Sequence, residues 1–113
     1  MPFIDARISK KLTDEQKTQL KTGLGGIMSL IGKPESYTMI CIQDDCALYF
    51  GGRRLEEGAY LAVDILGSKN PDNSGKFTAA ACSLLNEQLG ISGNNVYVEY
   101  RHTTDWGWNG GNF

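Results

Sequence analysis

The feature that most constrains the fold of this chain is a strand–helix–strand pattern that occurs twice. Ile31-Gly32 and Leu89-Gly90 each end a predicted helix, and the two glycines lie 58 positions apart. A glycine directly after the last helical turn is a typical stop signal. A predicted strand follows each pair after a loop of four or five residues. The pattern therefore predicts an α/β fold in which two β-α-β halves form one sheet, with both helices on the same face.

The first half begins with a predicted strand over residues 2–8. Thr13 and Gln16 then have the spacing of a capping box, in which each side chain satisfies an open backbone donor of the other residue. Apolar residues follow at helical spacing: Leu20, Leu24, Ile27, Met28 and Ile31. Glycines inside this helix each cost about 1 kcal/mol relative to alanine, and a close approach of the helix to a sheet would explain them: Gly23, Gly25 and Gly26. Residues 37–42 predict the second strand.

The second half repeats this order after a short strand over residues 47–50. Residues 59–66 predict a longer strand, and a helix then begins at Asn70-Pro71 or one turn later at Ser74. Gly90 ends this helix, and residues 96–101 predict the next strand. The tail, residues 106–113, is rich in glycine and aromatic residues, and we expect it to form a short extra strand.

Two of the predicted strands contain apolar residues at consecutive positions, Met39-Ile40-Cys41-Ile42 and Tyr60-Leu61-Ala62-Val63. Such runs are typical of strands that are buried on both faces of a sheet. Two helices can cover only one face, so we expect the other face to meet a second chain in an obligate oligomer.

Composition excludes several classes of function. The length of 113 residues corresponds to one domain, residues 1–113. The net charge of −2 gives no support for nucleic-acid or membrane partners, and no apolar run approaches the roughly 18 residues of a membrane span. Asp5 and Arg7 interrupt the first apolar stretch, so no secretory signal is predicted. We expect a cytoplasmic protein, with export without a signal peptide left open.

The sequence predicts neither a metal site nor a cofactor. Its three cysteines form no C-x-x-C pair and no cluster with histidine, so we expect reduced thiols: Cys41, Cys46 and Cys82. The segment from Gly26 to Lys33 resembles a phosphate-binding loop, but its glycine spacing is one residue too long and Pro34 replaces the hydroxyl residue. For His102, the single histidine, a solvated position at a strand end is favoured over a role as catalytic base.

The N-terminus, Met1-Pro2-Phe3-Ile4, offers an uncommon base. An initiator methionine is usually removed ahead of a small residue, which would leave Pro2 with a free secondary amine. A proline inside a chain has no N–H, whereas a proline at its head can accept and return a proton. Because Pro2 begins an apolar strand, we expect burial to lower the pKa of this amine. The simpler alternative is an ordinary initiator dipeptide that keeps Met1.

Five short motifs occur together along the chain: Met1-Pro2 before a strand, Gly32-Lys33-Pro34, Phe50-Gly51-Gly52, Val96-Tyr97-Val98 and Trp106-Gly107-Trp108-Asn109-Gly110. In this order they resemble the tautomerase superfamily, in the branch of macrophage migration inhibitory factor and D-dopachrome tautomerase. The resemblance covers nearly the whole chain.

The resemblance implies a β-α-β repeat with a mixed four-stranded sheet and two helices on one face. It also implies a homotrimer whose sheets line a central barrel, with active sites between subunits. The implied activity is cofactor-free interconversion of keto and enol forms of phenylpyruvate-like aryl keto acids. The alternative is a cytokine-like, host-modulating protein that binds a receptor and keeps a vestigial pocket.

Roles for individual residues follow from the same resemblance. Pro2 would be the general base, Lys33 would supply positive charge for the substrate carboxylate or enolate oxygen, and Tyr97 would donate a hydrogen bond from the adjacent subunit. Further residues would bind the substrate or shape an aromatic pocket: Phe3, Tyr37, Ile65, Leu66, Trp106, Trp108 and Phe113. Without the resemblance, Lys33 is simply a cation at a helix C-terminus, and the aromatic residues are candidates for subunit packing.

Glu99 departs from the pattern of this branch, whose vertebrate members have asparagine there. We expect Glu99 to lie at the substrate site. A carboxylate there would favour the protonated amine and repel an acidic substrate, in opposition to Lys33.

Overall fold

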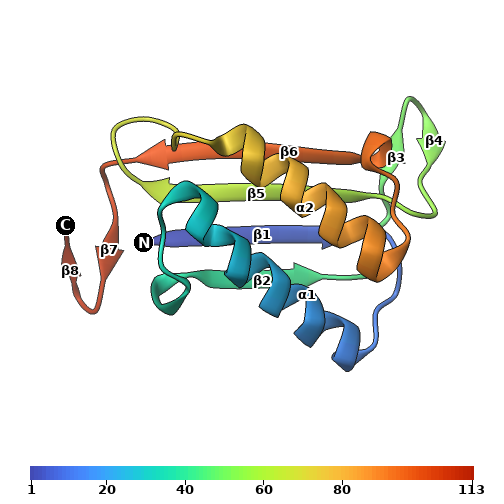
Figure 1. Cartoon of the computed structure of the whole chain (residues 1–113), viewed down its shortest axis with the longest axis horizontal. Coiled ribbons are helices and arrows are strands. Elements are labelled where there is room, and N and C mark those ends of the chain that lie inside the picture. Colours follow the sequence, from blue (N-terminus) through green and yellow to red (C-terminus); the bar gives the residue numbers. More distant parts are fainter.

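The computed structural model describes residues 1–113 and contains a four-stranded sheet with two helices on one face (Figure 1). In spatial order its strands are β2 (Met39–Gln43), β1 (Pro2–Ile8), β5 (Ala59–Leu66) and β6 (Val96–Thr103). Helix α1 (Asp14–Ile27) links β1 to its parallel neighbour β2, and α2 (Ser74–Leu89) links β5 to its parallel neighbour β6. The two halves join where β1 runs antiparallel to β5. The predicted pair of β-α-β halves in one mixed sheet is therefore confirmed.

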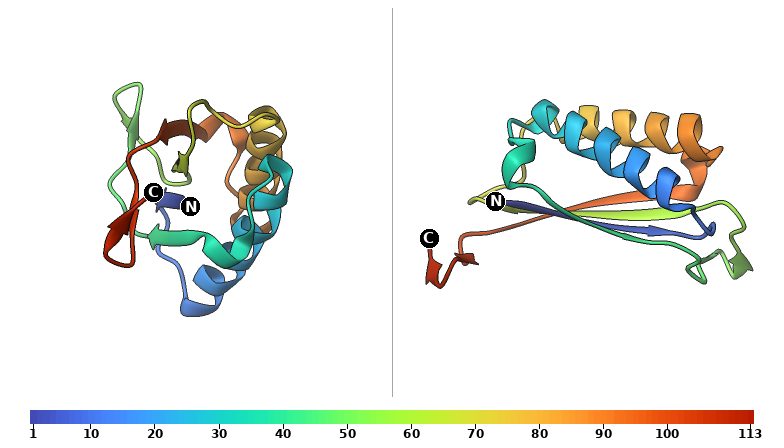
Figure 2. Two further views of the ribbon diagram at one scale, coloured as in Figure 1. Left: turned by 90° about the vertical axis from the view of Figure 1, so that its left-hand side faces the viewer. Right: turned by 90° about the horizontal axis from the view of Figure 1, so that it is seen from below.

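Short elements complete the fold, and the two hairpins among them lie beyond opposite ends of the sheet (Figures 1 and 2). They are three 3-10 helices, η1 (Met28–Ile31), η2 (Glu35–Tyr37) and η3 (Gly93–Asn95), and two hairpins, β3 (Tyr49–Phe50) with β4 (Arg53–Arg54) and β7 (Gly107–Trp108) with β8 (Gly111–Asn112). The second strand begins at Met39 rather than at Tyr37, because Tyr37 ends η2. The tail forms a hairpin where a single strand was expected.

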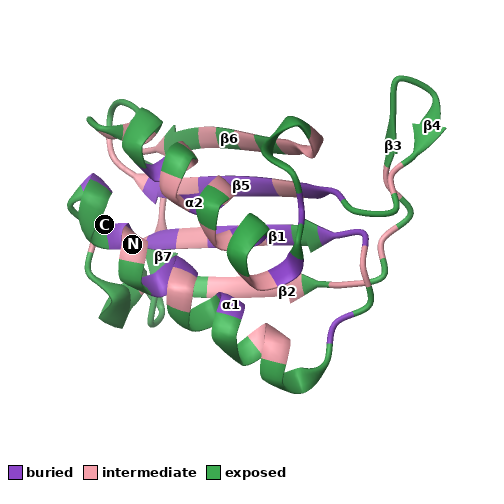
Figure 3. Ribbon diagram, turned by 45° about the vertical axis from the view of Figure 1, so that its right-hand side comes forward, coloured by how far each residue is buried: buried purple, intermediate pink, exposed green.

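Side-chain alternation along the strands builds the core between the sheet and the helices (Figure 3). Ile4, Ala6 and Ile8 of β1 are fully buried against residues of both helices, and every second residue of β5 joins them. Phe77 is the largest of the fully buried side chains. None of the helices combines the length and the apolar character that crossing a membrane requires.

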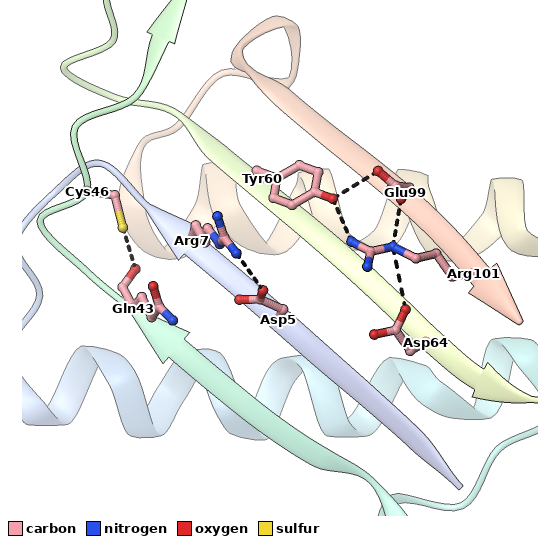
Figure 4. Close-up of polar contacts among 8 residues, drawn as sticks. All are labelled: Asp5, Arg7, Gln43, Cys46, Tyr60, Asp64, Glu99 and Arg101. Carbon is pink, nitrogen blue, oxygen red and sulfur yellow. Dashed lines mark hydrogen bonds and ion pairs between the residues drawn. The ribbon is translucent and has the colours of Figure 1, made fainter. Parts of the chain in front are cut away.

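The open face of the sheet is more polar than the apolar runs of β2 and β5 predicted. Ile40 and Ile42 pack against the core, whereas Met39 points away from it and is 70% exposed. Charged side chains from three strands occupy the open face (Figure 4): Asp5, Arg7, Asp64, Glu99 and Arg101. This face therefore carries charged side chains where the apolar runs had predicted a hydrophobic surface.

The glycines of α1 allow close contacts with neighbours other than the sheet, so the prediction of an approach to the sheet was wrong. A Cβ added at Gly23 would lie 2.9 Å from Cδ2 of Leu84 on α2. A Cβ added at Gly25 would lie 2.7 Å from the carboxyl carbon of Glu35 in η2, and one added at Gly26 would meet no atom. Two of these glycines thus set how closely α1 packs against α2 and η2.

The predicted capping box is present at the start of α1. The Gln16 backbone N–H donates to Oγ1 of Thr13 at 3.1 Å, and the Thr13 backbone N–H donates to Oε1 of Gln16 at 2.9 Å. These bonds satisfy two backbone donors that the helix itself cannot pair.

Replacement of Thr13 by alanine removes one side of the capping box, and we expect the free energy of unfolding to fall by about 1 kcal/mol. Urea denaturation followed by circular dichroism measures this change. Thr22→Ala is the matched control, because Thr22 is exposed inside the same helix and alanine has the higher helix propensity. Equal destabilisation by the two substitutions would show that the cap does not stabilise α1.

Candidate functional site

A cleft of about 920 Å³ lies at the end of the sheet where β1 begins and where β5 and β6 end. Figure 2 shows the N-terminus and the C-terminal hairpin at this same end. The cleft brings together six of the residues predicted for the site: Pro2, Phe3, Tyr37, Ile65, Trp106 and Trp108. They come from β1, η2, β5 and the chain around β7, so the residues nearest the N-terminus meet those near the C-terminus.

Strand register fixes the N-terminus at this position. Pro2 pairs with Ile65 in the antiparallel β1–β5 ladder, and Ile65 pairs with His102 in the parallel β5–β6 ladder. The Leu66 backbone N–H donates to the Met1 carbonyl oxygen at 3.1 Å, and the Pro2 side chain is fully buried. The chain therefore enters the sheet at Pro2 with little freedom, beside the cleft.

Aromatic side chains form the outer wall of the cleft. The rings of Tyr37 and Trp108 meet edge to face, with centroids 6.5 Å apart and planes at 89°. Asn109 and Gly110 both have positive φ, 50° and 82°, as the tight turn of a hairpin with a two-residue loop requires. This turn presents Trp108 to the cleft. Phe113, also predicted for the site, lies outside the cleft and is 61% exposed.

The N-terminal amine lies where its charged form is disfavoured. Burial lowers the pKa of the Met1 amine, and the positive charge of Lys33 lowers this pKa further. Met1 is attached in this structure, so the nitrogen of Pro2 is an amide and carries no basic lone pair.

Lys33 and Leu66 line a second hollow of about 520 Å³, which shares Ile65 with the cleft. Gly32 ends η1 in the left-handed conformation at φ 69°, and the Lys33 backbone N–H then donates to the Met28 carbonyl at 3.1 Å. Lys33 is thus held beside the N-terminus but outside the cleft, and it acts on the amine through its charge.

Tyr97 lies far from the cleft of its own chain. Its ring packs against Phe50 with centroids 5.1 Å apart, beside a third hollow near the β3–β4 hairpin. It is five positions before His102 on β6, or roughly 17 Å along the strand at about 3.4 Å per residue. Tyr97 can therefore reach a site of this kind only in another copy of the chain.

Glu99 also lies outside the cleft, where it joins a polar network on the open face (Figure 4). The Tyr60 hydroxyl donates to Oε2 of Glu99 at 2.9 Å, and Nε of Arg101 donates to Oε1 at 2.7 Å. These two hydrogen bonds, first that of Tyr60, lower the pKa of the Glu99 carboxyl. The structure thus places Glu99 in an internal ion pair rather than against a ligand within one chain.

Two charged residues that line the cleft, Asp64 and Arg101, were not predicted for the site, and His102, expected as a solvated residue at a strand end, lines it as well. The signal present in the sequence was a charged residue inside an apolar strand, Asp64. The structure then pairs Asp64 with Arg101 in the parallel ladder. His102 has its Nδ1 2.9 Å from Oδ1 of Asn70. The structure assembles no group of three His, Cys, Asp or Glu side chains that could hold a metal ion.

The similarity of this chain to known proteins extends over its full length. The family described as "Macrophage migration inhibitory factor (MIF)" matches residues 1–113. A macrophage migration inhibitory factor homolog of Trichinella spiralis is 29% identical over 115 aligned positions that cover all of both chains.

Solved structures share the same fold. The crystal structure of Leishmania major MIF2 superimposes with a TM-score of 0.90 and 30% identity, covering 100% of this chain and 97% of that one. A structure described as "Q0 fused 4-OT wild type symmetric trimer" matches with a TM-score of 0.82 over 96% of this chain and 93% of that one. At 23% identity, the latter likeness shows the fold alone.

Replacement of Lys33 by alanine should raise the pKa of the Met1 amine in the chain that keeps Met1. Loss of a nearby positive charge makes the protonated amine less costly. A pH series of α-amine labelling, read by mass spectrometry, measures the midpoint. Lys69→Ala is the control, because Lys69 lines the same hollow but forms an ion pair with Asp72. An unchanged midpoint in Lys33→Ala would contradict the proposed electrostatic contact.

Proposed function

The chain belongs to the macrophage migration inhibitory factor family of the tautomerase superfamily, and from this premise we propose that it is a cofactor-free tautomerase. The proposed reaction interconverts the keto and enol forms of phenylpyruvate-like aryl keto acids. Pro2, freed by removal of Met1, is the proposed general base.

The observation that carries this proposal is the environment of the N-terminal amine. Burial and Lys33 already lower the pKa of the amine at Met1. Pro2 is one residue further into the sheet, and its side chain is fully buried. Removal of Met1 would transfer the free amine to this more enclosed position, where the neutral form is favoured further. A general base works best when its pKa lies near the operating pH.

The chemistry is a proton transfer between two atoms of one ligand. The neutral Pro2 amine removes a proton from the carbon beside the carbonyl, and the electrons of the broken C–H bond shift to the carbonyl oxygen. The positive charge of Lys33 stabilises the negative oxygen that develops. The protonated Pro2 amine then gives its proton to this oxygen, which yields the enol and regenerates the neutral amine. The reverse sequence gives the ketone.

The lining of the cleft favours an aromatic substrate. Its wall combines the rings of Phe3, Tyr37, Trp106 and Trp108, which offer a flat apolar surface for an aryl group. The carboxylate of the keto acid would then be directed toward Lys33. This arrangement leaves the carbon between ring and carbonyl near the amine.

We further propose that the chain assembles as a homotrimer whose active sites lie between subunits. A structure with the same fold is described as a symmetric trimer. Large apolar side chains remain exposed at both ends of the sheet, including Tyr49, Phe50, Tyr97 and Trp108, and exposed patches of this kind mark interaction sites. Assembly would allow Tyr97 of one subunit to reach the cleft of the next.

Replacement of the base should remove the activity. In a phenylpyruvate keto–enol assay, we expect Pro2→Gly to lower kcat/KM by about two orders of magnitude or more, because general acid–base catalysis contributes roughly 10²–10⁴. We expect Lys33→Ala to lower kcat/KM as well. The mass of the intact protein first establishes that Met1 has been removed. Undiminished rates in both variants would exclude these roles.

A mixing experiment tests the intersubunit role of Tyr97. Pro2→Gly chains keep Tyr97, and Tyr97→Phe chains keep Pro2, so trimers refolded from both contain some complete sites. We expect the mixture to be more active than the sum of the separate variants, and light scattering to give three times the chain mass. Purely additive activity would place Tyr97 outside the site, and a monomeric mass would exclude the trimer.

A further inference from the structure

Four polar residues form a connected network beside the cleft, on the open face of the sheet (Figure 4). Tyr60 and Asp64 belong to β5, and Glu99 and Arg101 belong to β6. Asp64 and Arg101 pair directly in the parallel ladder, and both line the cleft. The network thus connects the open face with the wall of the proposed site.

Directed hydrogen bonds hold the guanidinium of Arg101. Its Nε donates to Glu99 at 2.7 Å, and its Nη2 donates to the Tyr60 hydroxyl at 3.1 Å. The Tyr60 hydroxyl donates in turn to the other oxygen of Glu99 at 2.9 Å. Hydrogen bonds between charged groups are stronger than neutral ones. This closed set of three contacts fixes Arg101 with its Nε 3.7 Å from Oδ1 of Asp64.

The same pair sets the charge of the cleft wall. Asp64 is the only aspartate or glutamate that lines the cleft, and Arg101 is the only lysine or arginine. Phe3 pairs with Asp64 in the antiparallel ladder, so Asp64 lies one strand position from the partner of Pro2. Without Arg101, the Asp64 carboxylate would face the cleft uncompensated. It would repel an anionic ligand and favour the protonated form of the nearby amine.

We propose that Arg101 is a specificity-determining residue that offsets the charge of Asp64 on the cleft wall, so that the cleft admits a ligand carrying a carboxylate. Glu99 and Tyr60 are positioning residues, which hold the guanidinium against Asp64. The inference rests on the proposed function only in using the same cleft.

The test compares two unreactive probes that have the same ring and differ in charge, phenylacetate and phenylacetamide. Calorimetric titration at pH 7 measures the affinity of each for the full chain. We expect the wild type to bind phenylacetate more tightly than phenylacetamide. We expect Arg101→Gln to weaken phenylacetate binding by about fivefold and phenylacetamide binding by less than about twofold, because loss of one partly exposed charge affects mainly the anion.

Two further variants separate charge from structure. Asp64→Asn combined with Arg101→Gln removes both charges, and we expect phenylacetate affinity to return to within about twofold of the wild type. Arg7→Gln is the matched control. Arg7 lies on the same face and pairs with Asp5 at 3.3 Å, but it does not line the cleft. We expect this variant to bind both probes as the wild type does.

Three outcomes would overturn the role of Arg101. The wild type could show no preference for phenylacetate, Arg101→Gln could lower the affinity for both probes equally, or the double variant could fail to recover its affinity for phenylacetate. Failure of the proposed reaction would give a different pattern of results. A wild type that shows the expected binding pattern but no keto–enol activity would refute the reaction and leave the role of Arg101 standing. If the wild type is an active tautomerase and the Arg101→Gln variant binds both probes as the wild type does, only the proposed role of Arg101 is refuted.

Discussion

The antiparallel pairing of β1 with β5 is the constraint on which the rest of the structure depends. Each β-α-β half supplies two parallel strands, and only this ladder, from Pro2 opposite Ile65 to Ile8 opposite Ala59, joins the halves into one sheet. Because the pairing is antiparallel, the start of β1 lies beside the ends of β5 and β6. The same pairing that completes the core thus delivers the N-terminal residues to the cleft.

The proposed site is governed by a balance between burial and charge. A proton-transfer base needs its neutral form to be populated, whereas an acidic ligand needs positive charge nearby. Burial and Lys33 both favour the neutral amine, and Lys33 also suits the ligand. Asp64 works against both needs, and Arg101 offsets it through contacts that Tyr60 and Glu99 hold in place. On the roles proposed for these residues, the polar open face contributes to the charge balance of the site.

Sequence patterns predicted most of the fold because the limits of strands and helices depend mainly on neighbouring residues in the chain. The limits of β5 and the end of α2 follow from apolar runs and from Gly90, and the structure agrees. The packing partners of Gly23 and Gly25 could not be predicted, because they depend on α2 and η2 approaching α1 in space. Six of the predicted site residues meet in the cleft, and five lie outside it: Lys33, Leu66, Tyr97, Glu99 and Phe113. Asp64 and Arg101 were missed because only strand register brings residues from distant segments together.

The central claim is that a processed Pro2 amine is substantially uncharged near neutral pH, and its nitrogen can be observed directly. The chain has three prolines, Pro2, Pro34 and Pro71, so ¹⁵N-proline labelling gives two amide nitrogens as internal references. The account predicts that intact mass shows Met1 removed, and that the Pro2 nitrogen titrates with a midpoint clearly below the value of about 8 for an ordinary α-amine. Retention of Met1, or a Pro2 nitrogen that stays cationic throughout the neutral range, would contradict it.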